Sequence, residues 1–319
     1  MDARELTAHI RQHYIPVLVD QVFISNPLFT RLRAKEQIII DSGREIVLPF
    51  IFDKLTSGAY EFADTFDVSY KKTDDYMTFY WRGAWVNITI DNWSLAIGNG
   101  VEGVIPLLDA KMYNAESTLV DMLGYWCMDP AYSSAKSWDG LWNGVDDGNT
   151  YTTYGNITRT AGFTYGTTGY AALNSYVDTT GGNITLERLR YAMGKATIGT
   201  KKPDLILCRQ NIYDQLWSRV QPQQRFLGDR HNDLVNVGFE GITFDGAALM
   251  IDNHLPSGTI YGLNTDYIKM FVNKDRNFHF SDWQRPINSD QRVAQILLIG
   301  NLINQAPRLS FKFTGLTEY

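Results

Sequence analysis

The sequence predicts an α+β fold organised around one long helix. Apolar residues over 101–128 are separated by alternating steps of three and four, which places them on one helical stripe. Two earlier stretches, 45–52 and 76–90, read as strands, the second with clear period-two alternation. Beyond residue 199 short strands and a helix alternate, and two longer strands close the chain. Helical and strand signals therefore share one chain, without a linker that would divide it into independent halves.

Composition excludes several classes of protein. A chain of 319 residues buries roughly three quarters of its unfolded surface, so it needs no disulfide framework. Its cysteines, Cys127 and Cys208, lie far apart and beside no histidine, so we expect neither a metal site nor a redox pair. The net charge of -6 argues against a dedicated duplex-reading surface. No apolar run approaches the ~18 residues of a membrane span, and the acidic first residues do not resemble a secretory signal. We expect synthesis in a reducing cytoplasm and no membrane partner.

The first ninety residues predict two appendages. A short helix over 3–14 ends before Pro16, and its His9 and His13 lack the carboxylate or cysteine support of a metal site. The strands 45–52 and 76–90 predict a long hairpin, with a bulge where the apolar parity changes at 82–83. The connection between them is acidic and carries Phe62, Phe66 and Tyr70. Such a segment cannot pack easily on its own hairpin.

The second half predicts a mixed α/β region. After the helix, residues 130–183 are rich in Gly, Tyr, Thr and Asn, which is typical of irregular surface chain. Thr185 is a plausible cap for a helix through 196, and a strand at 203–208 precedes a helix at 209–220. Further strands are expected at 241–251, 259–263, 268–272, 292–303 and 309–313. In the last of these, three apolar residues alternate with Ser310 and Lys312.

Catalytic motifs are mostly absent. The segment 98–103 matches G-x-G-x-x-G, with Asp121 downstream, but a dinucleotide site requires repeated βαβ units and Glu102 would repel a pyrophosphate. The glycines are better explained as a flexible entry to the long helix. The acid pairs Asp74-Asp75 and Asp146-Asp147 lie in polar stretches, where they predict solvated turns. We expect no enzyme activity, no catalytic residue, no cofactor and no metal.

The order of elements, and several local stretches, resemble the major capsid proteins of tailed bacteriophages, which have the Johnson fold. The resembling stretches are SGREIVLP at 42–49, GNITR at 155–159, KPDLIL at 202–207 with Tyr213, QPQQRF at 221–226, GFEGITFDG at 238–246, YGLNT at 261–265 and GNL at 300–302. Together they span nearly the whole chain in order.

The resemblance implies a domain plan. It comprises an N-terminal arm (1–36), an extended loop (37–92), a peripheral domain (93–198) with a spine helix (101–128) and a Gly/Tyr-rich insertion (130–183), an axial domain (199–286), and C-terminal strands returning to the peripheral domain (287–319). It also implies hexamers and pentamers in an icosahedral shell around double-stranded DNA, contacted non-specifically. The shell would be part of the virion and be made in the host bacterial cytoplasm.

Exposed apolar appendages gain contacts by packing on copies of the same chain. We therefore predict that intersubunit contacts involve Phe23 and Phe29 on the arm and Phe62, Phe66, Tyr70, Trp81 and Trp85 on the loop. The alternative for each, Trp85 especially, is the subunit's own core. Lys54, Lys71 and Lys72 lie in the loop, but no motif selects a reacting pair, so no crosslink is predicted. A scaffolding protein, like the portal, is expected to be a separate chain.

Two other functions remain open. A bacterial nanocompartment shell would share the fold and would hold a cargo peptide inside. A β-rich carbohydrate-binding module or glycosidase would use exposed aromatic rings to stack on sugars. The long helix and the missing carboxylate context argue against this second alternative.

Overall fold

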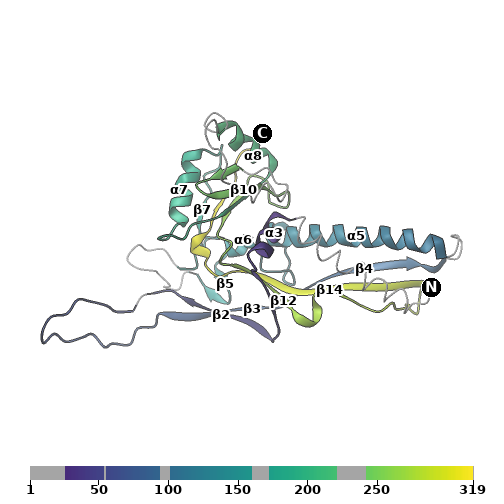
Figure 1. The fold of residues 1–319 in the computed structure, drawn as a ribbon, viewed down its shortest axis with the longest axis horizontal. Coiled ribbons are helices and arrows are strands. Elements are labelled where there is room, and N and C mark those ends of the chain that lie inside the picture. Colours follow the sequence, from purple (N-terminus) through teal and green to yellow (C-terminus); the bar gives the residue numbers. More distant parts are fainter. Residues whose placement is uncertain (1–25, 54, 94–100, 160–171, 221–241, 319) are drawn as a thin grey trace.

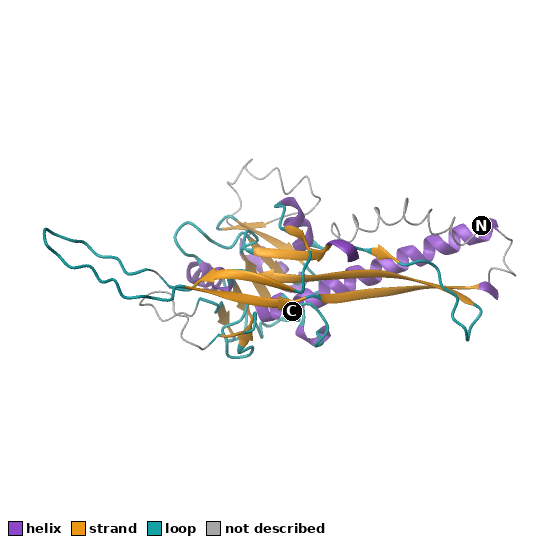
Figure 2. Ribbon diagram, turned by 90° about the horizontal axis from the view of Figure 1, so that it is seen from below, coloured by secondary structure: helices purple, strands orange, loops and turns teal. Residues whose placement is uncertain are grey.

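The computed structural model describes residues 26–53, 55–93, 101–159, 172–220 and 242–318. Figures 1 and 2 show an elongated molecule with a β-hairpin at one end and a long helix pointing to the other. The predicted helix at 3–14, with His9 and His13, lies outside the described residues. So do Phe23, Lys54 and the glycines at 98 and 100.

The long helix is confirmed. Helix α5 spans Val101–Met128, 28 residues, which corresponds to a rod of about 40 Å. Its stripe of Met112, Ala115, Leu119 and Leu123 is buried against the sheet below it. The predicted period therefore places the helix on the core.

A five-stranded sheet lies under α5. Its strand order is β1 (Ile38–Asp41), β12 (Ile268–Asn273), β14 (Gln291–Asn304) and β13 (His279–Phe280), and β4 (Arg82–Asp91) also pairs with β14. Strands β4 and β14 run antiparallel side by side along most of their length. In β4 alternate residues are buried, from Ala84 to Ile90, so one face of this ribbon packs on α5.

The hairpin differs from its prediction. Strand β2 (Glu45–Ile51) pairs antiparallel with β3 (Asp74–Tyr80), but the chain then leaves the hairpin at Trp81 and enters the five-stranded sheet as β4. The expected single strand over 76–90 with a bulge is therefore wrong. The change of parity at 82–83 marks a switch between two sheets. The predicted extended loop of 37–92 is also too wide for the hairpin itself, because β1 and β4 belong to the five-stranded sheet.

The base of the hairpin is anchored to the body by apolar contacts. Strand β2 alternates exposed and buried residues. Its buried side packs with Met77 and Phe79 against Tyr154, Phe271 and Ile303. Tyr154 belongs to the small pair β5 (Thr153–Tyr154) and β6 (Ile157–Thr158), and its hydroxyl donates to the carbonyl oxygen of Asn304 at 3.1 Å. The hairpin therefore projects from a fixed base.

Substitution of Gly155 tests this anchor. Gly155 has φ +56°, and a Cβ there would lie 2.7 Å from the Cβ of Met77. We expect Gly155→Ala to lower the free energy of unfolding by about 1–3 kcal/mol, measured by chemical denaturation. Gly182→Ala is the matched control, because Gly182 has φ +70° with no atom within 4 Å of the added Cβ. Equal losses in the two variants would show that the contact with the hairpin contributes nothing.

The second half forms a six-stranded sheet in the order β7, β15, β11, β8, β10, β9. The strands are β7 (Tyr176–Asp178), β8 (Leu205–Cys208), β9 (Ile242–Phe244), β10 (Ala247–Ile251), β11 (Ile260–Leu263) and β15 (Phe311–Phe313). Helices α7 (Leu186–Ala196) and α8 (Gln210–Val220) cover one face. The Thr185 hydroxyl accepts from the Arg188 amide, which confirms the predicted cap.

The other face of this sheet packs on α5. Alternate residues of β8 divide between the two faces, with Leu205 and Leu207 in the core that contains α5. The Tyr261 hydroxyl donates to the carbonyl oxygen of Met128, the last residue of α5, at 3.2 Å. Shorter helices complete the fold: α3 (Pro27–Ala34), α6 (Leu141–Gly144), η2 (Pro130–Tyr132), η5 (Lys274–Arg276) and η6 (Pro307–Leu309).

Candidate assembly surfaces

The loop at the end of the hairpin exposes apolar side chains to water. We call residues 55–70 the hairpin tip; every residue in it is exposed. Phe62 is 100% exposed and Tyr70 is 93% exposed. The other large apolar residues of the tip are Leu55, Tyr60, Phe66 and Val68. A folded chain gains nothing from such residues in isolation, and a contiguous exposed apolar segment marks an interaction surface.

The hairpin tip is also acidic. It contains Glu61, Asp64 and Asp67 and no lysine or arginine. Hydrogen bonds from Ser69 lower the pKa of Asp67, so this carboxylate stays ionised. The neighbouring lysines are engaged outside the tip: Lys71 pairs with Asp53 at 2.8 Å, and Lys72 pairs with Asp75 at 2.7 Å. Hydrogen bonding and the charge of Asp75 raise the pKa of Lys72, while hydrogen bonds from Lys72 and Tyr76 lower that of Asp75.

A groove of about 740 Å³ lies where β4 begins beside the last turns of α5. We call it the aromatic groove; its lining residues are Trp81, Arg82, Gly83, Trp85, Met122, Trp126, Ser134 and Lys136. Trp85 is 60% exposed. The Nε1 of Trp81 and the Nε of Arg82 are buried atoms without a hydrogen-bond partner among the described residues. The groove therefore offers aromatic surface and two cationic side chains.

The predicted contact residues fall into three groups. Phe62, Phe66 and Tyr70 lie on the exposed tip, and Trp81 and Trp85 line the groove. The prediction is wrong for Phe29, which is 1% exposed and belongs to the chain's own core through α3. Phe23 lies outside the described residues. The remaining five stay predicted contacts.

Sequence reasoning missed the α5 side of the aromatic groove. The apolar stripe predicted over 101–128 includes Met122 and Trp126, yet both are only half-buried and line the groove. The signal that could have found them is the width of the apolar stripe, because Leu123 and Cys127 fill the core positions beside them.

The hairpin tip and the aromatic groove lie on different parts of the chain. In Figures 1 and 2 the tip extends beyond β2 and β3 at one end of the molecule, whereas the last turns of α5 and the start of β4, which line the groove, lie in the body.

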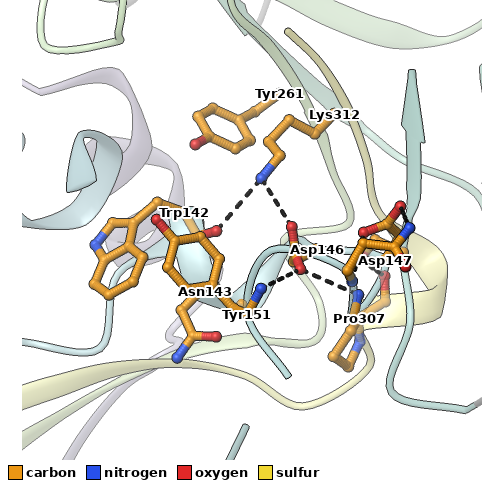
Figure 3. Close-up of polar contacts among 12 residues, drawn as sticks. Trp142, Asn143, Asp146, Asp147, Tyr151, Tyr261, Pro307 and Lys312 are labelled. Carbon is orange, nitrogen blue, oxygen red and sulfur yellow. Dashed lines mark hydrogen bonds and ion pairs between the residues drawn. The ribbon is translucent and has the colours of Figure 1, made fainter. Parts of the chain in front are cut away.

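A buried charged cluster organises the Gly/Tyr-rich region. Asp146 is 1% exposed, and Figure 3 shows the ammonium of Lys312 beside its carboxylate, at 3.4 Å. The same carboxylate accepts from the backbone amides of Gly148 and Tyr151. Burial lowers the pKa of Lys312, and the charge of Asp146 opposes that effect. The prediction of a solvated Asp146-Asp147 turn is wrong for Asp146, which is buried.

Arg159 completes this cluster from the opposite side. It is fully buried and donates to the carbonyl oxygens of Asp146 at 2.7 Å, Leu173 at 3.1 Å and Asn143. Burial lowers the pKa of its guanidinium. Two backbone segments, 143–146 and the one at Leu173, are thereby tied to one cation. Composition alone predicts an irregular segment here and gives no sign of the buried ion that orders it.

No group of three or more metal-ligating residues occurs among the described residues, and no helix in that part of the chain is long and apolar enough to cross a membrane. The strand before α5, β4, pairs antiparallel with β14, whereas a dinucleotide site requires a parallel βαβ unit. The G-x-G-x-x-G match therefore lacks its structural context.

Comparison with known proteins identifies the fold. No family model and no curated protein matches the sequence. Among solved structures, the cyanophage A-1(L) capsid matches with a TM-score of 0.65 and 13% identity, over 89% of this chain and 91% of that one. The capsid of the native GTA particle matches with a TM-score of 0.58, 10% identity and 90% coverage of both chains. The SrpI encapsulin of Synechococcus elongatus matches with a TM-score of 0.56 and 10% identity, over 89% and 86%.

These similarities extend over nearly the whole chain, so they concern the complete architecture. They exclude the β-rich fold that a carbohydrate-binding module would require. Hairpin, long helix and mixed second sheet follow one another in the order expected from the sequence. The chain therefore has the Johnson fold of phage major capsid proteins.

Proposed function

We propose that the chain is a major capsid protein, which assembles as hexamers and pentamers into an icosahedral shell around phage double-stranded DNA. The observation that carries the proposal is the hairpin tip. It presents six large apolar side chains and three carboxylates outside the cores of its own chain. Burial of those side chains on a neighbouring copy supplies the apolar contact that the monomer lacks.

The aromatic groove is the surface that fits the tip. Its tryptophan rings match the tip's aromatic residues, and its Arg82 and Lys136 match the tip's carboxylates in charge. Because the two surfaces differ and lie apart on one subunit, their contact is head-to-tail. Head-to-tail contacts generate closed rings when the rotation closes, which is the geometry of a capsomer.

The other partners follow from this role. A separate scaffolding protein and a portal would control the shape of the shell. The net charge of -6 suits non-specific containment of DNA, whose charge small cations would neutralise. The protein would be made in the host bacterial cytoplasm and reside in the virion capsid.

Electron microscopy tests the proposal directly. The chain would be expressed alone and together with the genes adjacent to its own, and the particles would be imaged by negative stain. Closed shells of uniform diameter are the expected result. A chain that remains monomeric at high concentration in both preparations would overturn it.

The second candidate is a nanocompartment shell, favoured by the similarity to the encapsulin. Both candidates assemble through the same surfaces, so the contents of the particle distinguish them. Packaged DNA, and neighbouring genes for a terminase and portal, support the capsid. A cargo protein held inside by a terminal peptide supports the nanocompartment.

A further inference from the structure

His254 lies where the six-stranded sheet meets helix α5. It lies in the loop between β10 and β11 of the six-stranded sheet, with its ring against α5. A Cβ added to Gly124 of α5 would lie 2.6 Å from the His254 ring, so the ring sits directly on the helix backbone. The ring also meets Tyr125 edge-on at 5.0 Å, and Tyr125 stacks in turn on Tyr132 of η2.

Two carboxylates, one from the loop of His254 and one from α5, contact the imidazole ring. The Nδ1 atom lies 2.7 Å from Oδ1 of Asp252 in its own loop, and Nε2 lies 3.5 Å from Oδ1 of Asp121 on α5. Asp252 is buried with a side chain 1% exposed, whereas Asp121 is 64% exposed. Within the described part of the chain, His254 is the basic side chain in contact with Asp252, and Oδ2 of Asp252 has no hydrogen-bond partner there. The backbone amide of His254 also donates to Oδ1 of Asp252 at 2.9 Å, so a neutral imidazole would leave this buried carboxylate hydrogen-bonded but without a countercharge.

We propose that protonated His254 is a latch that fixes the six-stranded sheet to α5, and that loss of its proton loosens this contact. The charged and titratable groups around the latch are Asp121, Tyr125 and Cys127 of α5, Asp252 of the loop, Tyr132 of η2, and Arg209, whose guanidinium reaches the Asn253 carbonyl at 3.5 Å. Asp252 and Asp121 both favour the protonated imidazole. Arg209 contacts the loop's backbone.

The expected pH dependence follows from the same contacts. Burial lowers the pKa of His254, but the hydrogen bonds and charges of Asp252 and Asp121 outweigh burial and raise the pKa above its ordinary value. A raised pKa in the folded state means that the latch is fully closed below about pH 6.5, the unfolded value. It opens as the pH rises through the folded pKa. Each pH unit between the two values changes the opening equilibrium about tenfold.

The test follows the latch in the full chain by two measurements. Histidine-selective NMR, with the His254 resonance assigned by its loss in His254→Gln, gives the pKa, which we expect above that of an exposed histidine. Hydrogen exchange of residues 115–128, corrected for intrinsic rates, reports the opening of α5 from the sheet. We expect wild-type exchange to accelerate across the titration and His254→Gln to exchange fast at every pH.

Asp121→Asn is a second variant that should fold normally, because Asp121 is largely exposed. We expect it to lower the His254 pKa and to shift the opening to lower pH. Asp214→Asn on α8, another exposed helical carboxylate, is the matched control and should change neither measurement. A His254 pKa at or below the exposed value overturns the latch. So does exchange in α5 that has the same pH dependence in the wild type and in His254→Gln.

Discussion

A variant with Phe62→Ser, Phe66→Ser and Tyr70→Ser should remain a folded monomer under conditions in which the wild type forms shells. The three replaced side chains, Phe62, Phe66 and Tyr70, are exposed in the single chain. Burial of one phenylalanine contributes about 1.5–3 kcal/mol, so the two phenylalanines contribute about 3–6 kcal/mol per contact. That loss weakens each contact roughly a hundredfold to ten-thousandfold. Sedimentation velocity of the variant and the wild type at equal concentration measures the effect.

The thermal unfolding midpoint separates assembly from folding. Because these side chains make no core contact, the triple variant should unfold like a wild-type monomer, within about 0.5 kcal/mol. Replacing Thr56, Ser57 and Thr65 by alanine is the matched control, since these residues are equally exposed in the same loop but polar. The control should assemble normally. Shells formed by the serine variant would contradict the role of the tip.

The second large effect is expected at the buried charged cluster. Asp146→Asn keeps one carbonyl oxygen, which can replace the Oδ2 that accepts from the amides of Gly148 and Tyr151, but leaves the buried ammonium of Lys312 without a carboxylate. Breaking a buried ion pair on one side costs about 3–5 kcal/mol of unfolding free energy. Urea denaturation of the variant, compared with the wild type, measures this loss.

A double variant tests the physical cause of that loss. Asp146→Asn combined with Lys312→Met removes both charges and should recover most of the lost stability. Asp75→Asn breaks the exposed pair with Lys72 and should cost less than about 1 kcal/mol, because solvent screens that pair. If the double variant is as unstable as Asp146→Asn alone, the unpaired Lys312 is not the cause of the lost unfolding free energy.

The parts of the fold that sequence reasoning predicted are those with strong local periodicity. The stripe of α5 and the capping threonine of α7 each depend on near neighbours in the chain. The separation of β3 from β4 depends instead on which distant strand each one pairs with. A change of parity at 82–83 is compatible with a bulge and with a switch of sheets, so only the pairing resolves it.

The candidate site was predictable only in part, for a similar reason. An acidic segment with spaced aromatic residues between two strands indicated the exposed tip. The groove combines β4, α5 and the segment after η2, and no local pattern joins these three. Phe29, like Phe62, is a phenylalanine in a predicted appendage. The short helix α3, capped by Asn26, places Phe29 in the core. Burial of Asp146 and Lys312 likewise depends on their pairing across the fold.

The account's central claim is that the hairpin tip of one copy lies in the aromatic groove of another. Site-directed crosslinking tests it with Thr65→Cys in the tip and Ser134→Cys in the groove, introduced into separate chains that are mixed and assembled. The native Cys127 and Cys208 are buried, and burial raises the pKa of both thiols, so they do not compete. With a short bifunctional thiol reagent, the account predicts covalent dimers of the two chains in the shells. Ser117 is exposed on α5 outside the groove, so Ser117→Cys paired with Thr65→Cys should give few covalent dimers. Shells in which the Thr65 and Ser134 pair crosslinks no better than the Thr65 and Ser117 pair would contradict the claim.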